Sequence, residues 1–91
     1  MLIQIHVAST YMLFEVSSIN YDREKNLFGF APPGAERASV ISLDNPQWQE
    51  TEKEVYDIDS IKLFLGPQIY SIYPESMLSE VFQFKEKKKK D

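Results

Sequence analysis

The chain has 91 residues, a net charge of −4, 43% hydrophobic residues and no cysteine. This length predicts one domain with a single thin core, and the missing cysteine excludes disulfide bonds, thiolate zinc sites and a thiol nucleophile. The sequence shows no signal peptide and no apolar run of membrane-spanning length, so we expect a cytoplasmic protein without membrane contact.

Positive and negative charge are separated along the chain. Residues 85–91 contain five lysines and two acids, a net charge of +3, which leaves −7 on residues 1–84. We therefore expect residues 1–84 to form one small β-rich domain and residues 85–91 to form a solvated, lysine-rich tail. An acidic domain repels phosphate groups, so nucleic-acid binding is not expected of residues 1–84 and is left open for the tail.

Alternating apolar residues predict β-strands through the first half of the chain. The expected strands cover residues 2–7, 11–21, 27–31 and 38–43. The second of these changes phase between Val16 and Ile19, which predicts a bulge or sharp bend at Ser17-Ser18. Such a bend suits a small closed or half-closed barrel.

A hairpin hinged at Gly66-Pro67 is the most strongly indicated element of the second half. Ile61, Leu63 and Leu65 share one parity before the hinge, and residues 69–73 resume a β-type composition after it. The other expected elements are a loop at 46–51, a strand at 52–56, a turn at 57–60, a one-turn helix at 75–79 and a closing strand at 81–84.

These elements predict a mainly β fold, a small antiparallel barrel or curled sheet of about six short strands with at most one short C-terminal helix. The strand order over residues 11–65 is a long bent strand, a return strand, a loop, a strand, a short turn and a strand. This order resembles the SH3-like and Sm-like small barrels. The resemblance implies a fold and carries no function with it.

Acidic residues concentrate between Asp44 and Asp59, where six acids accompany one lysine. Glu50, Glu52 and Glu54 share parity and would line one face of a strand. One interpretation is a solvated face that protects a sheet edge from aggregation. The other is an acidic patch that docks on a basic protein, in its sharpest form a nucleic-acid mimic of the kind found among small inhibitors from viruses and mobile elements.

Aromatic residues are the second notable feature. Phe14, Phe28, Phe30 and Phe64 are expected mainly in the core. Trp48, in a polar loop, is interpreted either as a lid over the open end of a barrel or as an interface anchor. We predict a binding surface made of Trp48, Glu50, Glu52, Glu54, Asp57, Asp59, Tyr70 and Tyr73.

Catalytic and metal-binding patterns are not found. Asp57-Ile58-Asp59 lacks the further oxygen ligands of a calcium loop, His6 has no second zinc ligand, and the three glycines are too scattered for a phosphate loop. We therefore expect no metal, no cofactor and no catalytic residue.

The function predicted from these observations is that of a non-enzymatic acidic module that binds a basic protein, as an inhibitor, adaptor or assembly subunit. Self-association into a homo-oligomer is a further expectation, because an open barrel leaves strand edges that can pair. The alternative is a small barrel that binds nucleic acid or a nucleotide through Tyr70, Tyr73 and the lysine tail. A carboxylate-based hydrolase is a third hypothesis.

Overall fold

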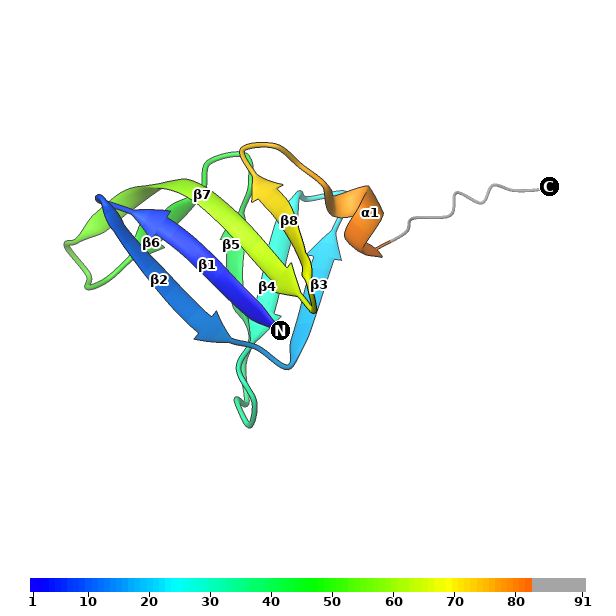
Figure 1. The fold of residues 1–91 in the computed structure, drawn as a ribbon. Coiled ribbons are helices and arrows are strands. Elements are labelled where there is room, and N and C mark those ends of the chain that lie inside the picture. Colours follow the sequence, from blue (N-terminus) through cyan, green and yellow to red (C-terminus); the bar gives the residue numbers. More distant parts are fainter. Residues whose placement is uncertain (83–91) are drawn as a thin grey trace.

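Two antiparallel sheets make up the computed structural model, which describes residues 1–82 (Figure 1). The larger sheet contains β1 (Leu2–Val7), β2 (Thr10–Glu15), β6 (Gln47–Gln49), β7 (Val55–Leu65) and β8 (Gln68–Tyr73). The smaller contains β3 (Ser18–Asp22), β4 (Leu27–Ala31) and β5 (Ser39–Ser42), and a short helix, α1 (Leu78–Phe82), follows β8. The mainly β, antiparallel fold with one short helix is confirmed, with eight strands in the described residues where about six were expected.

The strand order of the larger sheet is β2-β1-β7, with β6 and β8 both paired to β7, and tight hairpins join β1 to β2 and β7 to β8. The predicted hinge is confirmed, since Leu65 pairs with Gln68 and Gly66 has a φ of 60°. Two-residue hairpins favour such positive φ values. The same rule explains the β1–β2 turn, where Ala8 and Ser9 have φ values of 50° and 65°.

Strand β7 is longer than the sequence indicates. The predicted turn at 57–60 is wrong, because these residues continue a single strand of 11 residues. Val7 pairs with Ile58 and His6 with Ser60, so Asp59 is the extra residue of a β-bulge. The bulge lets one strand pair first with β6 and then with β1 and β8.

The bend expected at residues 17–18 is a crossing between the two sheets. Residues 11–21 therefore do not form one strand, and the structure divides them into β2 and β3. The N–H of Val16 donates to the carbonyl of Met1 (2.9 Å), and the N–H of Ser17 donates to the carbonyl of Ala31 (2.8 Å). The adjacent residues Val16 and Ser17 are therefore hydrogen-bonded to different sheets. In residues 1–82 no ladder joins the sheets, so they are arranged more openly than a closed barrel.

Three local expectations differ from the structure. The predicted loop at 46–51 contains the short strand β6, and the strand expected at 52–56 begins only at Val55. The helix lies at Leu78–Phe82 rather than at 75–79, so Val81 and Phe82 are helical and not part of a closing strand. The end of that expected strand and the lysine tail lie outside the described residues.

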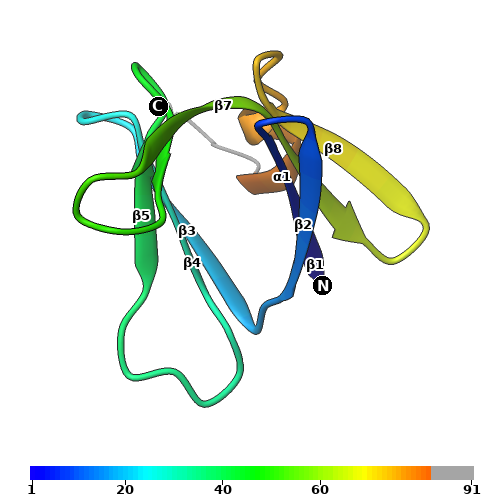
Figure 2. The same ribbon diagram turned by 90° about the vertical axis from the view of Figure 1, so that its left-hand side faces the viewer.

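The core fills the space between the two sheets, which Figure 2 shows from the side. The alternation of side chains explains which residues form the core, because every second residue of a strand points to the same face of the sheet. The strands supply Ile3, Ile5, Val7, Phe28, Phe30, Ile41, Ile58, Ile61, Leu63 and Ile72, and Val16, Leu43 and Leu78 complete the core. No polar or charged side chain of residues 1–82 is buried.

Candidate binding surface

The turn between β6 and β7, residues 50–54, holds three of the predicted binding residues. The prediction that Glu50, Glu52 and Glu54 line one face of a strand is wrong, because the chain reverses there. The N–H of Glu50 donates to the carbonyl of Glu54 (2.8 Å), and the hydroxyl of Thr51 accepts from the N–H of Glu54 (3.1 Å). All three glutamates are exposed. We call residues 50–54 the acidic turn.

Trp48 lies on β6 and not in a loop. Its indole is partly buried and packs against the core, with its ring centroid 5.5 Å from that of Phe14. Its N–H donates to Oε1 of Glu50 at 2.9 Å. The indole therefore covers part of the core, and its hydrogen bond to Glu50 brings it into contact with the acidic turn.

Asp57 and Asp59 are exposed on the first half of β7. Oδ1 of Asp57 accepts a hydrogen bond from the amide of Gln47 (3.2 Å). Oδ2 of Asp59 lies 3.8 Å from Nδ1 of His6, and the ring of His6 stacks on that of Tyr11 with centroids 4.3 Å apart. These acids therefore connect the acidic turn with the side of the larger sheet that carries His6.

Tyr70 and Tyr73 do not join this group. They lie on β8, which pairs with the second half of β7, whereas β6 pairs with the first half. Their cross-strand partners are the buried residues Leu63 and Ile61, and both tyrosines pack against the core. The predicted set is thus divided between the end of the sheet that carries Trp48 and the inner side of β8.

A surface that the sequence did not reveal lies on the side of the larger sheet that turns away from the core. We call it the outer face. Its residues come from four adjacent strands and are Tyr11, Leu13 and Glu15 of β2, Leu2, Gln4 and His6 of β1, Ser60, Lys62 and Phe64 of β7, and Ile69 and Ser71 of β8.

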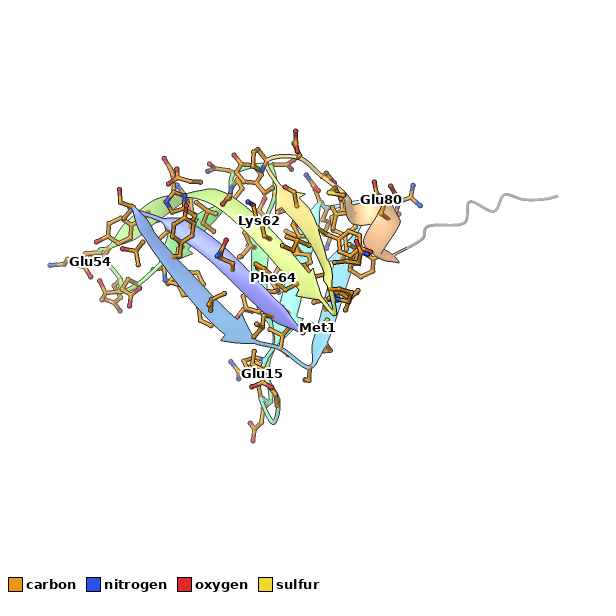
Figure 3. All side chains as sticks on the ribbon, in the orientation of Figure 1. Met1, Glu15, Glu54, Lys62, Phe64 and Glu80 are labelled. Atoms are coloured by element: carbon orange, nitrogen blue, oxygen red, sulfur yellow. The ribbon has the colours of Figure 1, made fainter. Side chains whose placement is uncertain are left out.

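The register places apolar residues of the outer face in one row. Leu2 pairs with Phe64, and Phe64 pairs with Ile69, while Glu15 ends the row on β2. Leu2 is 41% exposed and Ile69 is 56% exposed. Figure 3 shows Phe64 and Lys62 over the middle of this face and Glu54 at the far end of the molecule from Glu80.

Two more exposed hydrophobic residues belong to the outer face. Leu13 is 60% exposed and Tyr11 is 62% exposed, both on β2. Phe64, expected in the core, is only partly buried. The alternation of residues 61–65 is the signal that could have shown this, because Phe64 has the parity opposite to the buried Ile61 and Leu63.

An open hollow of about 490 Å³ lies where the outer face meets the segment that follows β8. Lys62, Ile69 and Met77 are among its lining residues. It gives the apolar row a concave end beside Ile69.

No helix in the described part of the chain has the length and apolar character needed to cross a membrane. Comparisons of the chain with protein-family models, with curated proteins and with solved structures found no match.

Proposed function

We propose that this protein is a non-enzymatic protein-binding module that docks its outer face on a basic protein. The observation that carries the proposal is the row of Leu2, Phe64 and Ile69, with Leu13 and Tyr11 beside it, on one exposed side of the larger sheet. Contiguous exposed apolar residues rimmed by polar ones are typical of protein interaction sites.

Burial of these side chains supplies the affinity in this proposal. Each square ångström of apolar surface removed from water is worth roughly 25 cal/mol. Phe64 stands in the middle of the row, and Ile69 lies at the hollow near Lys62. A partner side chain that enters this hollow would meet Ile69 and Met77 beside the charged side chains of Lys62 and Glu75. The expected contact is therefore a side chain with an apolar stem and a polar end.

Negative charge around the face specifies the chemistry of the partner. Glu15 ends the apolar row on β2, Asp59 lies beside His6 at another border, and Asp57 and the acidic turn continue beyond it. Complementary charge accelerates association and orients the partner. The partner that fits is a protein whose apolar contact surface is bordered by lysine or arginine residues.

A pull-down from an extract of the source organism, followed by binding measurements with the purified partner, tests the proposal. One variant combines Phe64→Ser with Ile69→Ser on the outer face. Its matched control is Val40→Ser, because Val40 is 59% exposed on β5 of the other sheet. A second variant combines Glu52→Lys with Glu54→Lys, and its control of equal net charge combines Glu24→Lys with Glu36→Lys, two exposed acids outside the larger sheet.

We expect the outer-face variant to lose the partner and the acidic-turn variant to bind more slowly, with a weaker dependence on salt. Both controls should bind like the native chain. Retention of the partner by the outer-face variant, or equal losses in the variants and their controls, would refute the proposed surface.

A further inference from the structure

Strand β2 has one edge without a partner strand. It pairs with β1 alone in the described chain, and Figure 2, in which the side of β2 is turned toward the viewer, shows no further strand along it. In an antiparallel sheet, successive residues of a strand point their backbone hydrogen-bonding groups alternately to the strand on one side and to the strand on the other. The bond between Val16 and Met1 (2.9 Å) sets this alternation.

Three residues of β2 consequently turn their backbone groups away from β1. The Val16–Met1 bond continues the β1–β2 register, so Thr10, Met12 and Phe14 also bond to β1. The N–H and carbonyl groups of Tyr11, Leu13 and Glu15 therefore point outward. Their side chains lie on the outer face, where Leu13 and Tyr11 are 60% and 62% exposed.

Within residues 1–82, no proline, lysine, bulge or covering segment protects this edge from pairing with another chain. Natural edge strands are protected by proline, lysine, a bulge or a covering segment. Strand β2 contains no proline or lysine, and its register is continuous over six residues. The edge of β8, in contrast, is covered, since the N–H of Met77 donates to the carbonyl of Ser71 (2.8 Å).

We propose that two copies of the chain pair along β2, antiparallel and centred on Leu13, so that the larger sheets join into one. This register uses all three outward-facing residues. Leu13 pairs with Leu13 of the second copy, and Tyr11 pairs with Glu15 of the second copy. Each pair exchanges two backbone hydrogen bonds, and each Glu15 meets a tyrosine instead of another acid.

The charge distribution of the chain fits a second copy in this orientation. Glu15 is the only charged residue of β2. The acidic residues near Tyr11, namely Asp59 and the acidic turn beyond it, lie at one end of the strand. Antiparallel pairing places these acidic ends at opposite ends of the joined sheet, so they do not face each other. The inference goes beyond the proposed function and does not depend on it.

Sedimentation equilibrium of the native chain and of two Leu13 variants tests the pairing. Leu13→Pro removes an N–H that turns away from β1 and makes no bond to the strands of residues 1–82, and proline is tolerated on edge strands in this orientation. We expect a dimer for the native chain, a monomer for Leu13→Pro, and a dimer for Leu13→Ala, which keeps the N–H. A monomeric native chain, or an undiminished dimer in Leu13→Pro, would overturn the proposal.

Disulfide trapping tests the register independently, because the chain has no cysteine. Residues directly opposite in such a pair have Cα atoms about 5.5 Å apart, within the range of a disulfide. We expect Leu13→Cys to form a disulfide-linked dimer, Tyr11→Cys alone to remain unlinked, and a mixture of Tyr11→Cys with Glu15→Cys to link. Linkage of Val40→Cys, on β5, as fast as that of Leu13→Cys would contradict the inference, even if Leu13→Pro failed to fold.

Discussion

The indole N–H of Trp48 donates to Oε1 of Glu50 at 2.9 Å, and this bond joins the only tryptophan to the acidic turn. Both residues belong to the larger contact surface that the sequence predicts. In the structure, the tryptophan ring packs against Phe14 and the glutamate accepts its polar hydrogen. The pair therefore closes one end of the core and holds the acidic turn against it.

Replacement of Trp48 is expected to destabilise the fold. Trp48→Ala should lower the free energy of unfolding by about 2 kcal/mol, which is below the range of about 3–5 kcal/mol for fully buried aromatic residues because the ring is only partly buried. Trp48→Phe should cost about 1 kcal/mol, since it keeps the contact with Phe14 and loses the hydrogen bond. Urea denaturation followed by circular dichroism measures both, and Glu52→Gln in the same turn serves as an unchanged control.

Two glycines should respond in opposite ways to alanine. Gly66 has a φ of 60° in the β7–β8 turn, so Gly66→Ala should cost about 1–2 kcal/mol, although no described residue beyond its chain neighbours lies within 4 Å of the added methyl group. At Gly29 the added methyl would make an ordinary contact, 3.5 Å from the carbonyl oxygen of Ser39. Gly29→Ala should therefore be neutral or stabilise by up to about 1 kcal/mol. Equal melting temperatures of the two variants would contradict this contrast.

Neighbouring isoleucines on β8 should differ sharply in their effect on stability. Ile72 is 1% exposed in the core, and Ile69 is 56% exposed on the outer face. We expect Ile72→Ala to cost about 2–4 kcal/mol through loss of burial and a cavity. Ile69→Ala should stay within about 0.5 kcal/mol of the native chain. Thermal unfolding of the two variants measures this difference. It also shows whether outer-face variants stay folded for binding measurements.

Asn26, in the β3–β4 turn, is hydrogen-bonded to the end of β3 and to the segment that follows β5. Its Oδ1 accepts from the hydroxyl of Tyr21 (2.6 Å), its Nδ2 donates to Asp44 (2.8 Å), and its φ is 55°. Asn26→Ala should cost about 2–3 kcal/mol, because it loses two hydrogen bonds and keeps the unfavourable backbone conformation. Asn26→Gly should cost about 1 kcal/mol less. A lower stability of Asn26→Gly than of Asn26→Ala in chemical denaturation would contradict this account.

The sequence predicts those elements whose cause is local. The β7–β8 hairpin follows from alternation and from the turn chemistry of Gly66-Pro67, and β1 follows from Ile3, Ile5 and Val7. Strand β6 has three residues and exists through its pairing with the start of β7, which no local pattern shows. Likewise, the turn-forming residues of 57–60 are held in β7 by their pairing with β1.

The candidate surface was predictable only in part. The exposure of the acidic turn follows from its composition, and the side of β7 that carries Phe64 follows from parity. The alignment of Leu2, Phe64 and Ile69 depends on which strands become neighbours, and these residues are far apart in the sequence. Registers between distant strands arise from tertiary packing, so the outer face emerges only from the fold.

The pairing of β1 with β7 has a consequence for the way the protein acquires its structure. Strand β1 pairs with a strand that follows more than fifty residues later in the chain. Contacts of such long sequence separation slow folding. Until β7 is synthesised, the N-terminal hairpin has no third strand, and isolated hairpins are only marginally stable in water. The larger sheet is therefore expected to form only after β7 has been synthesised.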